Sequence, residues 1–337
     1  MSALAVAIRG RTFRSLRIHH NYRLFFAGQI VSLAGSWMQN VALAWLVIEL
    51  SGSPLAVGAL AFCRFLPFTV LAPGAGVVVD RFDPRKLVIT TQAAAMAVSV
   101  ALAVVTLGGL ASLWLVYLLA ALGGVTLALD APGRQTLTFQ MVGPRELPNA
   151  VALNSGVFNA SRVVGPAIAG VTIATLGTGL CFAVNAFSFL AVLAALAWMR
   201  PAELRPLERA TTTGVLAGIR EGVRWVAATR ETRVVLLAVT ALSVVGFNFH
   251  VLVPLLASAR GVGAETFGLL SALFGGGAVV GALITATLRS TSTRTFLVGA
   301  GGFGALLVVL AVVDDVALAG LVLFALGLFF TLLTASA

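Results

Sequence analysis

Long, continuous apolar runs separated by short polar or basic stretches dominate this chain. A helix needs about 20 apolar residues to cross roughly 30 Å of hydrocarbon, and by that measure the sequence predicts ten membrane spans. Runs such as 113–129 show no alternation of polar and apolar residues, which excludes the strands of a membrane β-barrel. The predicted spans are 25–50, 54–79, 87–107, 113–129, 150–176, 181–199, 234–257, 267–288, 296–313 and 316–337.

The composition agrees with an all-α polytopic membrane protein. Hydrophobic residues fill 59% of the 337 positions and charged residues only 10%, against about 25% charged residues in a typical soluble domain. So few charges could not cover the surface of a soluble protein, which excludes soluble enzymes and disordered tails. The cysteines Cys63 and Cys181 lie inside apolar runs without metal-ligand spacing, and we interpret them as packing residues.

The formal net charge of +10 reflects membrane topology rather than nucleic-acid binding. Basic residues gather in alternate connections between spans, as expected for cytoplasmic loops, and only Arg260 departs from this alternation. The sequence therefore predicts a cytoplasmic N-terminus, contact with lipid and no nucleic-acid partner. The basic segments are 9–23, 81–86, 134–145, 200–233 and 289–294, whereas 51–53, 108–112 and 177–179 contain no Arg or Lys.

The longest connection, 200–233, follows the sixth predicted span and divides the chain. It places Val215, Ile219, Val223 and Val226 on one helical stripe, which is typical of a helix lying on the membrane surface. The expected parts are a basic cytoplasmic segment (1–22), a six-helix bundle (23–200), a linker with the interfacial helix (201–233) and a partial, four-helix bundle (234–337).

The two halves resemble each other at an offset of roughly 204 to 210 residues, as in transporters built from parallel repeats. The run 121–123 matches 325–327, and the run around Gly58 matches the run around Gly268. At this offset the counterpart of 134–200 is missing. We therefore expect a C-terminally truncated twelve-helix protein, with a stable ten-helix product as the alternative.

The connection between the second and third spans reads Gly76-Val-Val-Val-Asp80-Arg81-Phe-Asp83-Pro-Arg85-Lys86. It resembles the G-x-x-x-D-R-x-G-R-R/K loop of the major facilitator superfamily, with Asp83 and Pro84 where that family has Gly and Arg. The resemblance implies that Asp80 pairs with arginines and a helix end to close the cytoplasmic side. An ordinary basic loop is the alternative. The candidate switch residues are Gly76, Asp80, Arg81, Asp83, Arg85 and Lys86.

The fifth predicted span contains Arg162-Val-Val-Gly165-Pro166-Ala-Ile-Ala-Gly170. This resembles the antiporter-associated G-P-x-x-x-G element of the superfamily, in which Pro and Gly allow bending or tight packing during alternating access. Gly and Pro are common in membrane helices in general, so ordinary helix packing is the alternative. The stretches NYRLFFAGQIVSLAGSWMQ (21–39), LDAPGRQ (129–135) and PNAVALNSGVFNASR (148–162) resemble the branch that exports drugs and enterobactin-type siderophores.

Polar side chains inside spans are expensive in lipid and usually face a bundle interior or a wet cavity. The first and seventh spans each concentrate polar residues on one helical face, and the resemblance implies that these spans line a central substrate path. Hydrogen bonding between helices is the alternative. The candidate path residues are Gln29, Ser36, Asn40, Arg64, Asn159, Ser243, Asn248 and His250, with Arg162 entering from the fifth span.

Arg64 and Arg162 lie near the middle of the second and fifth spans, where an unpaired arginine costs at least about 3 kcal/mol. No acid of matching depth is evident, so either water and carbonyl groups or an anionic substrate group satisfies them. The candidate proton-coupling residues are Glu49, Asp130 and His250. Only His250 lies on the predicted path, where a histidine with an unperturbed pKa of about 6.5 can switch. A packing role is the alternative.

The sequence contains neither GxxxxGK[ST] nor HExxH and no metal-ligand cluster, so we predict no catalytic residue, metal or cofactor. The resemblance implies a monomeric secondary transporter of the bacterial inner membrane, which exports amphipathic small molecules in exchange for protons by alternating access. An importer or facilitator of the same fold, or a truncated membrane protein without transport activity, is the alternative. The substrate, the direction of transport and the coupling ion are not determined by the sequence.

Overall fold

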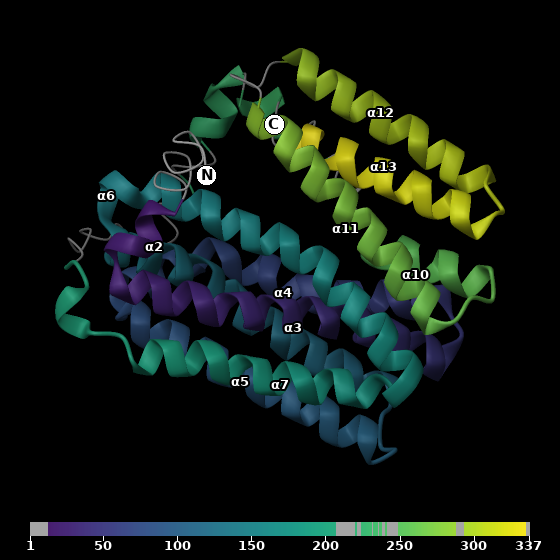
Figure 1. Cartoon of the computed structure of the whole chain (residues 1–337), viewed down its shortest axis with the longest axis horizontal. Coiled ribbons are helices and arrows are strands. Elements are labelled where there is room, and N and C mark those ends of the chain that lie inside the picture. Colours follow the sequence, from purple (N-terminus) through teal and green to yellow (C-terminus); the bar gives the residue numbers. More distant parts are fainter. Residues whose placement is uncertain are drawn as a thin grey trace, which may run out of the picture. The chain divides into compact units, whose positions relative to one another are not determined.

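The computed structural model describes residues 13–206, 220, 224–230, 232–234, 236–237, 240, 249–287 and 293–334. All regular structure in this part of the chain is helical, and eight of its helices are long and apolar enough to cross a membrane. The predicted all-α polytopic membrane fold is therefore confirmed. The elements are α2 (Arg14–Ile18), α3 (His20–Ser51), α4 (Pro54–Arg81), α5 (Pro84–Leu107), α6 (Leu113–Leu176), α7 (Thr178–Ala197), the 3-10 helix η1 (Pro201–Glu203), α10 (Phe249–Ala259), α11 (Ala264–Thr287), α12 (Thr293–Val312) and α13 (Val316–Thr334) (Figure 1).

The fourth and fifth predicted spans are two helices that meet in a kink at Gly143 and together form α6. The drop in hydropathy at 130–149 indicated a connection, but the structure is helical there except at Gly143, where φ is 70° and ψ is 176°. Glycine reaches positive φ without a Cβ clash, and Pro144 suits the first turn of the limb that follows. Polar residues lower the hydropathy without ending a helix. We call 113–142 and 144–176 the first and second limbs of α6.

The predicted interfacial helix falls largely on residues that the structure does not describe. Val215, Ile219 and Val223 are outside the described residues, and Val226 lies in a helical segment at 224–228. The position of this segment at a membrane surface therefore stays a prediction, as does the cytoplasmic location of the N-terminus.

The chain divides into two compact units, each assembled from three stretches. Unit 1 consists of Met1–Ser36, Ala59–Phe158 and Gly179–Val215, and unit 2 of Trp37–Gly58, Asn159–Thr178 and Leu216–Ala337. Helix α3 and the second limb of α6 each contribute residues to both units. The expected boundaries at 200 and 234 follow sequence repeats instead, and they stay a prediction.

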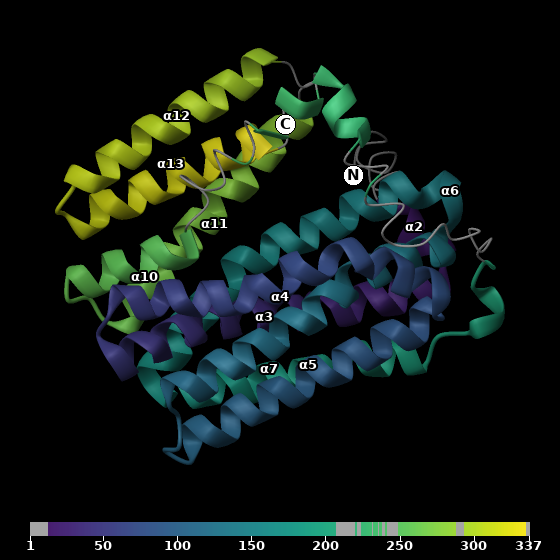
Figure 2. The ribbon, with the colours of Figure 1, turned by 180° about the vertical axis from the view of Figure 1, so that it is seen from behind.

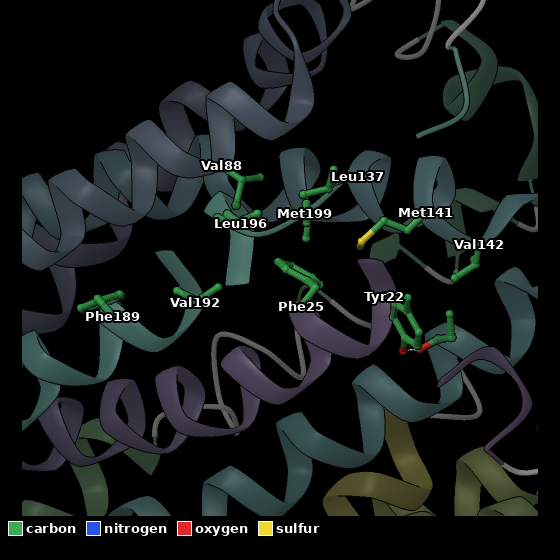
Figure 3. Close-up of a cluster of buried hydrophobic side chains, with 11 residues drawn as sticks. Tyr22, Phe25, Val88, Leu137, Met141, Val142, Phe189, Val192, Leu196 and Met199 are labelled. Carbon is green, nitrogen blue, oxygen red and sulfur yellow. Dashed lines mark hydrogen bonds between the residues drawn. The ribbon is translucent and has the colours of Figure 1, made fainter. Parts of the chain in front are cut away.

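The hydrophobic core of unit 1 joins α3, α5, α6 and α7 (Figure 3). Tyr22 and Phe25, in the first turns of α3, are completely buried. The Tyr22 hydroxyl donates to the carbonyl of Ala150 at 2.9 Å and lies 3.0 Å from Oδ1 of Asn154, so this buried polar group is satisfied. These bonds tie α3 to the second limb of α6. The remaining core side chains include Val88, Leu137, Met141, Val142, Phe189, Val192, Leu196 and Met199.

A buried ion pair within the first limb of α6 also accepts hydrogen bonds from α5. Asp130 accepts a hydrogen bond from Nε of Arg134 at 2.5 Å, and the two side chains are only 12% and 14% exposed. The same carboxylate accepts from Thr91 Oγ1 and Gln92 Nε2, both at 2.8 Å. The Arg134 guanidinium also lies 5.7 Å from the centroid of the Phe25 ring. Asp130 is thus engaged by partners on two helices.

In unit 2, α13 packs against both α11 and α12, as the two opposite views show (Figures 1 and 2). Glycines permit the close approach of α11 and α13. A Cβ on Gly277 would collide with the carbonyl of Phe324, and a Cβ on Gly281 would collide with the carbonyl of Leu328. Membrane helices commonly use small residues in this way, because packing rather than the hydrophobic effect holds them together.

The sequence repeat is visible in the helix contacts of each unit. In unit 1, Gly124 of α6 packs against the carbonyl of Arg64 on α4; in unit 2, Gly327 of α13 packs against the carbonyl of Phe274 on α11. Phe274 is the counterpart of Arg64 at the 210-residue offset. Gly327 is the counterpart of Gly123, the neighbour of Gly124, at the 204-residue offset. In each unit, therefore, a glycine lets two helices cross closely, and the helices of the two crossings are related by the repeat. The two glycines differ by one residue from exact repeat positions.

We predict that Asp130→Ala lowers the free energy of unfolding by about 3 to 5 kcal/mol, because removing one partner of a buried ion pair leaves the other charge uncompensated. Thermal unfolding of the purified protein in detergent measures the change. The control is Glu203→Gln, which breaks the exposed pair with Arg200 and should cost about 1 kcal/mol or less. Equal effects of the two substitutions would contradict a structural role for the Asp130 pair.

Candidate functional site

A pocket lies within unit 2, between α3, the second limb of α6, α10, α11 and α13. Its empty volume is about 670 Å³, including space that opens to the outside. The lining combines aromatic rings with a few polar groups, which is the usual character of a small-molecule site. The residues that give it this character are Trp37, Asn40, Arg162, Phe267, Phe274 and Phe330.

Helical spacing brings these side chains to one place. Phe267, Ser271 and Phe274 stand four and three residues apart on α11, and Trp37 and Asn40 stand three apart on α3. Residues three or four apart share one face of a helix. The helices α3 and α11 therefore each turn a single mixed polar and aromatic face toward the pocket.

The guanidinium of Arg162 lies among three aromatic rings of the pocket. Its Cζ atom is 5.4 Å from the centroid of the Trp37 ring, 5.5 Å from that of Phe274 and 5.3 Å from that of Phe330. These distances are typical of cation–π contacts, which attract the positive charge to the ring faces. Among the described residues, no carboxylate forms an ion pair with Arg162.

Backbone packing holds Arg162 in place. Pro166 has no N–H and cannot bond the carbonyl of Arg162 one turn earlier. Gly275 of α11 faces this carbonyl, and a Cβ at Gly275 would collide with it. One further turn along, Gly170 and Gly268 meet through their backbones, also without room for a Cβ. The Gly-Pro element thus lets the second limb of α6 and α11 cross in direct backbone contact.

Asn40 contributes a polar group that lacks a partner among the described residues. Its Oδ1 atom is buried and accepts no hydrogen bond there, and an unmet buried acceptor costs roughly 1–3 kcal/mol. Nearby, the ring of Phe267 stacks on Trp45, with centroids 5.5 Å apart, and Trp45 Nε1 donates to Glu49 Oε1 at 2.7 Å. The pocket therefore places the stacked ring of Phe267 near an Asn40 oxygen that has no partner among the described residues.

Two of the residues predicted to meet a substrate, Asn40 and Arg162, lie together in this pocket. Gln29, Ser36 and Arg64 belong to unit 1 and are not among the lining residues. Gln29 is buried, and the Ser36 hydroxyl bonds the preceding turn of its own helix at 2.8 Å. For these three residues a place on the substrate path stays a prediction.

The side chains of the candidates on the seventh predicted span lie outside the part of the chain that the structure describes. Ser243 and Asn248 lie outside the described residues, and His250 is in α10 with a side chain that is also outside them. Asn159 lies in the second limb of α6, within unit 2, but does not line the pocket. It therefore stays a prediction that the first and seventh spans face each other across a substrate path.

The two other candidate proton-coupling groups have different surroundings. Glu49 is exposed and bonded to Trp45. Asp130 is buried and engaged by Arg134, Thr91 and Gln92. Neither residue lines the pocket of unit 2.

The connection between α4 and α5 contains a helix-start signal that the sequence analysis treated only as a departure from the family loop. The Asp83 side chain caps α5 by accepting a hydrogen bond from the N–H of Lys86 at 3.0 Å, and Pro84 follows in the first turn. Asp at the cap and Pro at the next position are both favoured at helix starts. Arg85 donates to the carbonyl of Leu196 from Nε at 2.9 Å and from Nη2 at 2.7 Å, at the end of α7.

The remaining residues of the candidate switch loop show fewer contacts. Arg81 and Lys86 are exposed, and the position that a Cβ would occupy on Gly76 has no described atom within 4 Å. Asp80 lies in the last turn of α4, with a side chain outside the described part. The pairing of Asp80 therefore stays a prediction, whereas Arg85 does contact the end of a neighbouring helix.

The aromatic half of the pocket was missed in the sequence analysis. Phe267, Phe274 and Phe330 read as ordinary packing residues, because aromatic side chains are common throughout apolar spans. A signal existed in the register: Trp37 stands three residues before Asn40, and Phe274 three residues after Ser271. A search for aromatic residues on the same helical face as a single polar residue would have found this pocket better than the search for several polar residues on one face.

Solved structures share the fold of this chain. The chain superimposes with a TM-score of 0.67 on a bacterial homologue of the human lysosomal transporter Spinster, over 94% of this chain and 74% of that one at 15% identity. A bacterial homologue of the iron transporter ferroportin gives a TM-score of 0.63 over 94% and 82% of the two chains, also at 15% identity. The fold is that of a multi-pass membrane transporter.

The family follows from the sequence as a whole. Residues 11–336 match the model of the transmembrane secretion effectors. The chain therefore belongs to this family of major facilitator transporters, as the loop and helix motifs predicted.

Curated relatives of this chain carry transporter names. The staphyloferrin A transporter of Staphylococcus aureus is 24% identical over 78% of this chain and 66% of its own length. The multidrug efflux pump Tap of Mycolicibacterium fortuitum is 32% identical over 57% of this chain and 49% of its own length. Macrolide efflux protein A of Streptococcus pyogenes is 22% identical over 85% and 72%. The chain thus spans about two thirds of the length of the staphyloferrin A relative.

We predict that Gly275→Ala lowers the free energy of unfolding by about 1–3 kcal/mol, because the added methyl group forces α11 away from the Arg162 carbonyl. Thermal unfolding in detergent measures this change. Gly301→Ala on α12 is the matched control, since a Cβ there meets no described atom within 4 Å. An equal response of both variants would show that the backbone crossing does not stabilise unit 2.

Proposed function

We propose that this protein is a secondary active transporter that exports amphipathic small molecules from the cytoplasm by alternating access. The observation that carries the proposal is the unit 2 pocket, in which aromatic rings accompany Arg162 and Asn40 among membrane-spanning helices. A mostly apolar lining with a few polar groups suits amphipathic ligands. The relatives named for multidrug, macrolide and staphyloferrin A transport support a drug, macrolide or siderophore-like substrate.

We further propose that entry of protons drives export, and that the protein acts as a monomer in the inner membrane of a bacterial cell. The bacterial sources of the relatives support this location. The coupling group is sought among Glu49, Asp130 and His250. His250 fits the role best, because it is the residue of the three that the sequence places on the substrate path.

Everted membrane vesicles from cells that express this chain test the function. When respiration acidifies the vesicle lumen, we expect uptake of at least one of three amphipathic probes, radiolabelled erythromycin, the cationic dye ethidium or an N-dansyl carboxylate, above that of vesicles without the protein. Nigericin, which collapses the pH gradient, should abolish this uptake. Uptake only in right-side-out vesicles would indicate an importer, and uptake independent of the gradient would indicate a facilitator. No gradient-driven flux of any amphipathic compound would contradict the proposal.

We predict that Asp80→Asn lowers transport per inserted molecule by about tenfold, because a charge-assisted contact worth roughly 1.5–3 kcal/mol is lost from the closed cytoplasmic side. Flux divided by the amount of protein in the membrane is the quantity to measure. Glu203→Gln is the control, since it removes an exposed carboxylate outside this loop. If both variants transport at the native rate, the loop serves only as a signal for topology.

A further inference from the structure

Arg162 places a permanent positive charge in the unit 2 pocket. A guanidinium stays protonated in proteins, and an uncompensated charge inside a membrane span is unfavourable. Arg134 of unit 1 shows how this chain balances such a charge, with the carboxylate of Asp130 at 2.5 Å. Arg162 has no such carboxylate among the described residues. The charge is therefore available to a group that enters the pocket.

The ring contacts of Arg162 do not use up its hydrogen-bonding capacity. The rings of Trp37, Phe274 and Phe330 surround the guanidinium at 5.3–5.5 Å. A planar guanidinium that stacks on ring faces keeps N–H donors along its edge, and their fork matches the two oxygens of a carboxylate. The aromatic surround also fixes the orientation of the side chain, which lowers the entropy lost on binding.

Asn40 gives a second, independent indication of a ligand. Its buried Oδ1 atom has no partner among the described residues, and the side chain lines the same pocket. A buried acceptor without a partner is unfavourable until a donor reaches it. A ligand that carries a hydrogen-bond donor would satisfy this atom, while the pocket's aromatic walls would cover an apolar body.

We propose that the transported molecule is an amphipathic organic anion. Its oxyanion binds the N–H edge of Arg162, a hydrogen-bond donor meets Asn40, and its apolar part packs against Phe267 and the neighbouring rings. This inference rests on the proposed export function and names the substrate class of the same pocket. A cationic amphiphile would meet repulsion from Arg162 and bind more weakly than an anion of equal size.

Two dansyl probes that differ only in charge test the proposal. N-dansyl-6-aminohexanoate carries a carboxylate, and its N-methylamide is neutral. Binding to the full chain in phosphatidylcholine nanodiscs is followed by energy transfer from tryptophan to dansyl. We expect the carboxylate to bind at least about tenfold more tightly than the amide, as a charge-assisted hydrogen bond provides. Equal affinities would overturn the inference.

Variants separate recognition of charge from packing. Arg162→Gln should remove the preference for the carboxylate while the neutral amide still binds, and Arg162→Lys should keep part of the preference because the charge remains. The control Arg17→Gln removes an exposed arginine of α2 and should leave the preference unchanged. A loss of binding of both probes in Arg162→Gln would show that Arg162 only maintains the shape of the pocket, which overturns the inference.

A measurement on the native protein covers the case in which Arg162→Gln does not fold. Phenylglyoxal modifies arginines, and mass spectrometry reports the modification of each one. The carboxylate probe should slow the modification of Arg162 several-fold more than that of Arg17, and the amide should not. Equal slowing by both probes, or displacement of the carboxylate by added phosphatidylglycerol, would overturn the assignment to a transported anion. In the second case the pocket binds a lipid headgroup.

The everted vesicles distinguish failure of this inference from failure of the proposed function. Gradient-driven export of erythromycin or ethidium by a protein without preference for the carboxylate probe would reject the anionic substrate and leave the exporter standing. Preference for the carboxylate without gradient-driven flux of either this probe or the drugs would support the anion site and reject the exporter.

Discussion

The interior of a bilayer offers no water to polar groups, and this constraint governs how the polar residues of this chain are arranged. In unit 1 the buried carboxylate of Asp130 is surrounded by partners: it binds Arg134, Thr91 and Gln92 on two helices. At the end of α7, Arg85 satisfies carbonyl groups that the helix itself leaves without donors. Polar side chains of this kind join helices to one another.

Arg162 in unit 2 departs from this pattern. Aromatic rings, and no described carboxylate, surround its guanidinium, and the adjacent pocket contains a buried amide oxygen of Asn40 without a described partner. Unmet polar groups are costly in a low-dielectric interior unless a ligand completes them. Asp130, which has partners on two helices, therefore serves to hold the bundle together. Arg162, which has no described carboxylate partner, is suited to bind a ligand.

Close helix contact through small residues is the second requirement of this fold. Lipid is as apolar as the helix surface, so association depends on fit between backbones. The crossings at Gly124 and Gly327 recur at repeat-related positions, and Gly275 and Gly268 let α11 approach the second limb of α6. Because Gly275 packs on the carbonyl of Arg162, the contact that stabilises unit 2 also positions the pocket's charged residue. We therefore expect a change at this backbone contact to alter both the stability of unit 2 and the proposed ligand site.

The local sequence determined the class of this protein and most of its helices, since each span depends on the hydropathy of about 20 consecutive residues. It also singled out Arg162 and Asn40, because polar residues stand out in apolar runs. It placed the connection between the fourth and fifth spans at 130–149, and the structure narrows this connection to the kink at Gly143, because the polar residues on either side remain helical. The aromatic pocket was decided by tertiary structure alone: Phe274 and Phe330 meet Arg162 from distant parts of the chain. Local hydropathy cannot encode which faces of separate helices meet, because that depends on packing between backbones far apart in sequence.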